Sequence, residues 1–222
     1  MKAGFFVAGT DTGVGKTLVA AALLRCFRAL GLRAAGMKPV AAGCEQGRND
    51  DVEALLGAGT SGLDRSLVCP YLFEPPIAPH IAAAEAGVRI DLAVIEIAFR
   101  KLQSRADVVI VEGVGGFRVP LGEREDAGAI PKRLGLPVVL VVGLRLGCLN
   151  HALLTQEALE AEGLVLAGWV VNRIDPAMAR AEENIAALRQ RLRAPLLADV
   201  PYGAPSGFPV ALERLWPARG SP

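Results

Sequence analysis

The fold is decided by the run Phe5-Phe6-Val7-Ala8-Gly9-Thr10-Asp11-Thr12-Gly13-Val14-Gly15-Lys16-Thr17. Four apolar residues lead into a glycine-rich loop that ends in Gly-Lys-Thr, and an amphipathic segment follows at once. A strand, such a loop and a helix in this order are typical of the loop that holds the phosphates of a nucleoside triphosphate. Glycines let successive backbone N–H groups converge on phosphate oxygens, and the N-terminus of the next helix adds partial positive charge. The run therefore predicts a nucleotide site.

The loop departs from the standard spacing at its start. That spacing would place the first glycine at position 10, which is Thr10, whereas Gly9 lies one residue earlier. The other end of the loop is regular. Lys16 can supply a mobile charge for the β- and γ-phosphates, and the hydroxyl of Thr17 can bind Mg²⁺.

Composition limits the class of protein. The chain has 222 residues, 52% of them hydrophobic, and a formal net charge of +1. This length suits one domain with a sizeable core, and we expect residues 1–216 to form it and residues 217–222 to be a frayed tail. So small a net charge does not indicate binding to nucleic acid or to an acidic membrane surface. The apolar runs are too short to span a bilayer. The polar loop after residue 9 interrupts the first apolar run, which argues against a signal peptide. The four cysteines are scattered along the chain and match neither a disulfide framework nor a zinc site. We expect a cytoplasmic enzyme.

Strand and helix patterns alternate along the chain. We expect strands at 4–8, 33–40, 107–112, 137–142 and 165–171, and helices at 16–30, 91–104, 148–162 and 178–193. Alternation of this kind implies right-handed crossovers between parallel strands. The predicted fold is a single-domain α/β structure of the P-loop NTPase type, with a doubly wound, mostly parallel sheet and helices on both faces. Residues 57–86 are the least readable part.

Chemically useful side chains gather at the carboxyl ends of the predicted strands, where open α/β sheets bind ligands. Lys38 lies near the end of the second strand, Glu112 ends the third, and Asn172 follows the last. Lys38 is either an exposed strand-end lysine or a cation beside a transferring phosphoryl group or a carboxylate-like intermediate. A charge at Glu112, at the end of an apolar strand, would be costly without a partner, which favours a ligand there.

Asp51 has two interpretations. With Glu112 and Thr17 it could complete a magnesium site of oxygen ligands. The pair Asp50-Asp51 is equally typical of a helix N-cap before Val52. The residues alone leave both possibilities open.

Five stretches in chain order resemble the dethiobiotin synthetase family: Gly9–Thr17, Met37–Val40, Val111–Gly116, Gly147–Ala152 and Gly168–Asn172. The resemblance extends to about Pro201, and the displaced first glycine is a feature of that family's loop. It implies ATP-dependent closure of a ureido ring from 7,8-diaminopelargonic acid and CO₂ in biotin biosynthesis. One amine captures CO₂ as a carbamate, ATP converts this to a carbamic-phosphoric anhydride, and the second amine closes the ring with release of phosphate.

The resemblance also implies roles for individual residues. Lys38, Lys16 and Thr12 would be catalytic, and Thr17, Asp51 and Glu112 would bind Mg²⁺. The nucleotide would contact Gly13, Val14, Gly15, Lys16, Thr17, Leu18, Asp51, Glu112, Gly113, Val114, Gly115, Asn172, Arg173, Pro201 and Tyr202, with Asn172 at the adenine. The diamine would contact Thr12, Lys38, Ala42, Gly147 and Asn150. The family is a homodimer with its substrate at the interface, and the helix start at Gly147–Asn150 would bind the substrate carboxylate across that interface.

Two positions depart from the family pattern. The family usually has a hydroxyl residue where this chain has Ala42, and residues 203–209 match no family pattern. Two other ATP-dependent classes are less favoured. Enzymes that amidate corrin side chains usually carry a glutamine-hydrolysing domain, for which 222 residues leave no room. Switch ATPases of the partitioning or septum-positioning type usually have a lysine near the start of the loop, where this chain has Gly9-Thr10-Asp11.

Overall fold

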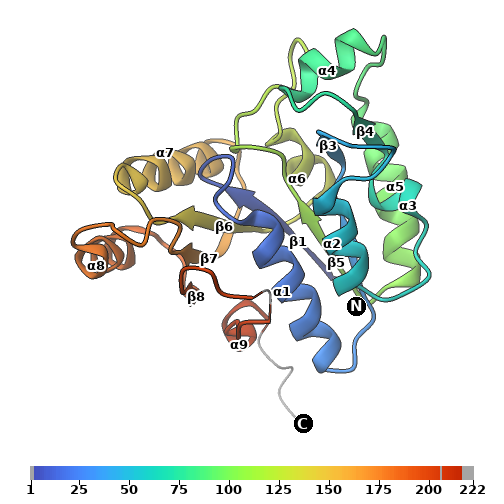
Figure 1. Cartoon of the computed structure of the whole chain (residues 1–222). Helices are drawn as coiled ribbons and strands as arrows, with labels where there is room; N and C mark the ends of the chain where they lie inside the picture. Colours follow the sequence, from blue (N-terminus) through green and yellow to red (C-terminus); the bar gives the residue numbers. More distant parts are fainter. Residues whose placement is uncertain (1–2, 206, 217–222) are drawn as a thin grey trace.

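The computed structural model describes residues 3–205 and 207–216, to which all structural statements below refer. Its central sheet has six parallel strands in the order β2-β5-β1-β6-β7-β8 (Figure 1). The strands are β1 (Ala3–Gly9), β2 (Ala34–Met37), β5 (Val108–Glu112), β6 (Val138–Gly143), β7 (Leu166–Asn172) and β8 (Leu196–Val200). The chain builds outward from β1 to both sides. The loop after β1 therefore lies at the point where the strand order reverses, which is where such sheets bind ligands.

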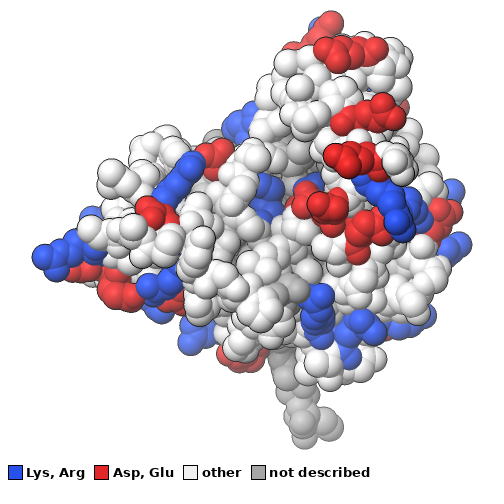
Figure 2. Space-filling model, in the orientation of Figure 1, with Lys and Arg blue, Asp and Glu red and all other residues white. Residues whose placement is uncertain are grey.

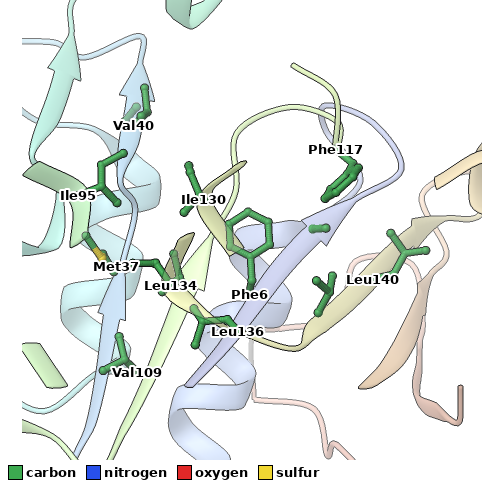
Figure 3. Packing of buried hydrophobic residues seen from close by; sticks show 14 of the residues in the cluster. Phe6, Met37, Val40, Ile95, Val109, Phe117, Ile130, Leu134, Leu136 and Leu140 are labelled. Carbon is green, nitrogen blue, oxygen red and sulfur yellow. The ribbon is translucent and has the colours of Figure 1, made fainter. Parts of the chain in front are cut away.

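Helices cover both faces of this sheet, because successive side chains of a strand point to opposite sides. Phe5 and Val7 of β1 pack with one group of helices, and Phe6 and Ala8 pack with the other. The first group contains α1 (Lys16–Ala29), α2 (Asp50–Ala58) and α9 (Leu212–Leu215). The second contains α5 (Leu92–Arg105), α6 (Ala129–Leu134), α7 (Cys148–Ala161) and α8 (Ala181–Arg191). Figure 3 shows Phe6 among the side chains of this second layer. The predicted doubly wound fold is confirmed.

The predicted strand at 33–40 is wrong as a single element. β2 ends at Met37, and beyond Pro39 the chain forms β3 (Val40–Ala42), which pairs with β4 (Tyr71–Phe73) in a separate two-stranded parallel sheet. Pro39 lacks an N–H group and restricts the backbone of Lys38, so the ladder to β5 stops there. The Lys38 N–H donates instead to the carbonyl of Val68 at 2.8 Å.

Other differences lie at boundaries and in the segments that sequence patterns left unassigned. The helix predicted at 178–193 begins only at Ala181, because Arg180 has a φ of 58° outside the helical region. The prediction omitted α3 (Arg65–Val68), α4 (Pro79–Glu85), α6, α9, β4 and β8. No helix in residues 3–205 and 207–216 is long and apolar enough to cross a membrane. The predicted tail at 217–222 lies outside the described residues, and the single-domain division stays a prediction.

Candidate active site

The glycine-rich loop at 9–17 leaves the sheet beside β6. The N–H of Thr10 donates to the carbonyl of Val141 at 3.0 Å, which continues the β1–β6 pairing by one step. Gly13 and Gly15 have φ angles of 73° and 94°, a left-handed conformation that favours glycine. Val14 between them is buried and anchors the loop in the core. The loop therefore curves around the N-terminus of α1, as phosphate binding requires.

The side chain of Asn172 contacts the phosphate loop and supports its conformation. Asn172 ends β7, is 7% exposed, and its Nδ2 donates to the carbonyl of Val14 at 2.9 Å. A Cβ atom at Gly15 would lie only 2.3 Å from that Nδ2. Position 15 therefore has to be glycine for lack of space as well as for its φ angle. The contact of Asn172 with adenine stays a prediction.

Four polar side chains meet at the start of α1. Thr17 Oγ1 lies 2.7 Å from Asp51 Oδ1 and 2.8 Å from Glu112 Oε1. Lys38 Nζ donates to Asp51 Oδ2 at 2.8 Å and to Glu112 Oε1 at 2.5 Å. Lys38 is 4% exposed and Glu112 is 1% exposed. The lysine is therefore not an exposed strand-end charge; both groups are buried and paired.

The structure excludes one of the two interpretations of Asp51, that of a helix N-cap. The N-cap of α2 is Asn49, whose Oδ1 accepts from the N–H groups of Asp51 and Val52 at 3.1 and 3.3 Å. The capping interpretation of Asp50-Asp51 is therefore wrong. Asp51 lies in the first turn of α2, and its carboxylate belongs to the polar cluster.

Lys38 of the cluster and Lys16 of the loop differ in their electrostatics. Burial lowers the pKa of Lys38, but the carboxylates of Glu112 and Asp51 outweigh this effect and raise it overall. Burial and then the charge of Lys38 lower the pKa of Lys16 to about 8. Lys16 Nζ donates to the main-chain carbonyl of Asp11 at 2.9 Å. Lys38 is thus held charged, whereas Lys16 loses its proton more readily than an ordinary lysine.

The donor set of the cluster fits a magnesium ion. Among the described residues, Glu112 Oε2 is buried without a hydrogen-bond partner. Thr17 has one hydroxyl proton, so it can donate to only one of the two carboxylates that it contacts. Mg²⁺ takes one or two carboxylates and fills its other positions with water and phosphate oxygens. Within the described ranges no three His, Cys, Asp or Glu side chains gather so that they could hold a metal ion by themselves.

A cavity of about 860 Å³ opens over this cluster. Its polar lining includes Lys16, Thr17, Lys38, Asp51 and Glu112. Figure 2 shows basic atoms set back in the middle of this face, with acidic side chains beside them. The remaining lining from the predicted site residues comprises Thr12, Gly13, Gly15, Leu18, Ala42, Val114 and Gly115.

Part of the cavity lining is apolar and was missed by sequence reasoning. It comes from Ala41, Val119 and the segment 76–79, which follows β4. This segment lies in the part of the chain whose pattern was least readable. The prolines of this segment were the sequence signal that could have marked it as an ordered turn, because Pro76 and Pro79 restrict the backbone after β4.

Several predicted nucleotide contacts lie outside the cavity lining. The guanidinium of Arg173 forms a bidentate ion pair with Asp199, with Nε–Oδ1 and Nη2–Oδ2 distances of 2.8 and 2.7 Å. It also contacts Glu182 at 2.6 Å. These carboxylates raise the pKa of Arg173 and hold its guanidinium between β8 and α8. Pro201 and Tyr202 follow β8 and are exposed.

Three further predicted residues also lie away from the cavity. Gly113 packs against Phe6, so that a Cβ there would lie 2.9 Å from the Phe6 ring. Gly147 is the N-cap of α7 with a φ of 94°, and Asn150 lies in the first turn of that helix. Within one chain, α7 does not reach the cavity.

Comparison with known proteins gives a clear result. A family model described as an AAA domain matches residues 3–209. The ATP-dependent dethiobiotin synthetase BioD of Aromatoleum aromaticum is 59% identical over 206 residues, which cover 90% of this chain and 91% of that protein. The corresponding protein of Nitrosospira multiformis is 58% identical over 202 residues, which cover 91% of this chain and 89% of that protein.

Solved structures support the fold. Cobyrinic acid a,c-diamide synthase from Mycobacterium smegmatis, with bound ADP and magnesium, matches with a TM-score of 0.60 and 18% identity over 97% of this chain and 92% of that one. Identity this low shows only a shared fold, so it does not revive the corrin-amidating alternative. The sequence identities and the motif order agree, and the chain belongs to the ATP-dependent dethiobiotin synthetase family.

Proposed function

We propose that this protein is an ATP-dependent cyclo-ligase that closes the ureido ring of dethiobiotin from 7,8-diaminopelargonic acid, CO₂ and ATP in biotin biosynthesis. One observation carries the proposal beyond family membership. Two buried lysines, Lys16 of the phosphate loop and Lys38 beyond β2, line one cavity together with two carboxylates. A cavity of this kind suits a reaction in which two anions, a carbamate and a triphosphate, have to meet.

The chemistry has three steps, each of which moves negative charge. An amine of the substrate attacks CO₂ and loses a proton, which gives a carbamate. A carbamate oxygen then attacks the γ-phosphorus, and ADP leaves. The second amine attacks the carbonyl carbon of the resulting anhydride, loses its proton, and expels phosphate as the ring closes. Cations fixed where this charge develops stabilise the transition states without reorganising.

The described side chains divide these tasks. Lys16 would leave the carbonyl of Asp11 and contact the β- and γ-phosphates, while Lys38 would stabilise the carbamate and the transferring phosphoryl group. Thr12 lies at the cavity wall, where it could bind the diamine. Thr17, Asp51 and Glu112 would hold Mg²⁺, which when bound neutralises phosphate charge.

We place the rest of the nucleotide along the carboxyl edge of the sheet. Its phosphates would lie on residues 13–18 and on the glycine-rich segment 113–115. Its base would lie toward Asn172, Arg173, Pro201 and Tyr202. Support comes from the positions of these four residues at the ends of the neighbouring strands β7 and β8.

We further propose a homodimer whose substrate site lies at the interface, in the cytoplasm where ATP is available. The aliphatic part of the diamine would follow the apolar wall near Ala42. Gly147 and Asn150 at the start of α7 would receive the substrate carboxylate bound to the other subunit. The apolar side chains of Leu146 and Leu154 on the same segment are 91% and 55% exposed, which favours a partner there.

The test is an assay of the purified protein with ATP, bicarbonate and diaminopelargonate. We expect dethiobiotin by mass spectrometry, equimolar ADP, and ADP release that depends strongly on both other substrates. Vigorous ATP hydrolysis without the diamine, unchanged by its addition, would overturn the proposal. Light scattering during gel filtration tests the dimer, for which we expect a particle of two chains.

A further inference from the structure

We infer that Arg145 is a positioning residue, which holds the front of the phosphate loop (residues 10–13) in place through Asp11. The inference rests on the proposed function, because it concerns the geometry of that reaction. Arg145 is neither a motif residue of the loop nor part of the cavity lining. Its position was not suggested by any sequence pattern.

Asp11 is the contact point of the loop front. Its Oδ2 accepts from Arg145 Nη2 at 2.5 Å, and its Oδ1 accepts from the N–H of Thr12 at 2.7 Å. Its main-chain carbonyl accepts from Lys16 Nζ at 2.9 Å. One residue thus joins Arg145 to the two loop residues that we place closest to the reacting groups.

Arg145 is itself anchored on both sides. It follows β6, and the N–H of the preceding residue, Leu144, donates to the carbonyl of Asn172 at 2.7 Å. Its own carbonyl accepts from the N–H of Cys148, in the first turn of α7, at 3.0 Å. The loop leaves the β1–β6 pairing at Thr10. Arg145 therefore connects a rigid sheet edge to a loop segment that extends beyond the sheet.

The contact matters for geometry more than for overall stability. Both side chains are 43% exposed, and exposed ion pairs contribute little to folding free energy. Lys16 has to leave the Asp11 carbonyl when it turns to phosphate. The Arg145–Asp11 pair then remains as the side-chain contact that ties the loop front to β6. Misplacement of reacting groups by about 1 Å can slow a reaction by about 100-fold.

The experiment compares Arg145→Met and Arg145→Lys with Arg33→Met. Arg33 makes a similar exposed ion pair with Asp107 at 2.8 Å. These two residues precede β2 and β5, at the amino ends of the strands, whereas Arg145 lies beyond the carboxyl end of β6. We expect Arg145→Met to lower kcat about tenfold, with KM for ATP changed by less than about twofold, because loop geometry and not charge attraction is lost. Arg145→Lys should recover most of the rate, since a single N–O contact has to be remade. Arg33→Met should behave as wild type.

A second background tests whether Arg145 acts through Asp11. In an Asp11→Ala protein, Arg145→Met should cause no further loss, because Arg145 has nothing left to hold. Amide hydrogen exchange over residues 9–17, which does not depend on turnover, should be faster in Arg145→Met and unchanged in Arg33→Met. Additive losses, an effect confined to KM for ATP, or unchanged exchange of the loop would overturn the inference. A wild-type protein that makes no dethiobiotin would overturn the proposed function alone, and the exchange measurement would still decide the inference.

Discussion

Lys38 and Glu112 form a buried ion pair, with 2.5 Å between Nζ and Oε1. The pair joins the ends of β2 and β5, which are neighbours in the sheet. Asp51 completes it at 2.8 Å from the same Nζ. The two carboxylates that neutralise Lys38 are also the ones that we assign to Mg²⁺. The ammonium group and a metal bound there would therefore compete for the negative charge of the same two carboxylates.

Replacement of Lys38 by Met should separate metal binding from catalysis. We expect Mg²⁺ to bind the ADP complex about tenfold more tightly, or about 1.4 kcal/mol, because the competing cation is gone. Turnover should fall by at least about 100-fold, as it does when a charge-stabilising donor is removed. Calorimetric titration with Mg²⁺ measures the first effect and dethiobiotin formation the second.

Two further variants make this result interpretable. Lys132→Met removes an exposed lysine that contacts Glu162 at 2.9 Å, and it should change neither quantity. Lys38→Gln also removes the positive charge but keeps hydrogen-bond donors beside the carboxylates. It replaces Lys38→Met in the experiment if the loss of a buried partner prevents that variant from folding. Metal affinity that stays unchanged or weakens in both Lys38 variants would show that the ammonium does not compete.

Lys16 should destabilise the ligand-free protein in a pH-dependent way. Its pKa is lowered from 10.5 to about 8, first by burial and then by Lys38. The unfolded chain therefore holds this proton more tightly, so the penalty is fully present below about pH 8 and disappears between about pH 8 and 10.5. Lys16→Met should thus raise the free energy of unfolding at pH 7 and raise it less at pH 9.5. Urea titrations at the two pH values measure this, and a gain independent of pH would contradict it.

Gly15→Ala should damage the site more than Gly13→Ala. Both glycines have a positive φ, at 94° and 73°, so both substitutions cost about 1–2 kcal/mol of backbone strain. Only at Gly15 would the new methyl group meet another atom, Nδ2 of Asn172 at 2.3 Å, whereas no described atom lies within 4 Å of the corresponding position at Gly13. We expect weaker ATP binding in Gly15→Ala, measured by calorimetry. Partial recovery in Gly15→Ala with Asn172→Ala would identify the clash as the cause, and equal effects of the two glycine variants would exclude it.

Ala42→Ser should lower KM for the diamine about fivefold, which corresponds to one added hydrogen bond of about 1 kcal/mol. Ala42 lines the cavity at the end of β3. KM for ATP should stay unchanged, because we place the nucleotide phosphates on residues 13–18 and 113–115 and not at Ala42. Steady-state kinetics with each substrate varied in turn provide the check. Ala42→Val is the control, since it adds volume without a hydroxyl group and should not lower KM for the diamine.

Much of the fold was predictable from local patterns. The strands at β1, β5, β6 and β7 were found because each is a short apolar run bounded by turn residues, and α1 because its apolar stripe follows a Gly-Lys-Thr sequence. β3 and β4 were not found, since three-residue strands carry too little periodicity to recognise. Pro39 contained the signal for the break in the second strand, but its effect depends on which neighbour the strand pairs with.

The sequence by itself determined the phosphate loop, the alternation of strands and helices, and the family, because each of these rests on residue order and spacing along the chain. Only the tertiary structure decided that Asp51 is a cluster residue and not a helix cap, and that Lys38 is buried on Glu112. It also decided that Asn172 supports the loop and that Arg145 reaches Asp11. The physical reason is distance along the chain. Thr17 meets side chains 34 and 95 positions away, and such contacts exist only once strand order has placed the carboxyl ends of β1, β2 and β5 side by side.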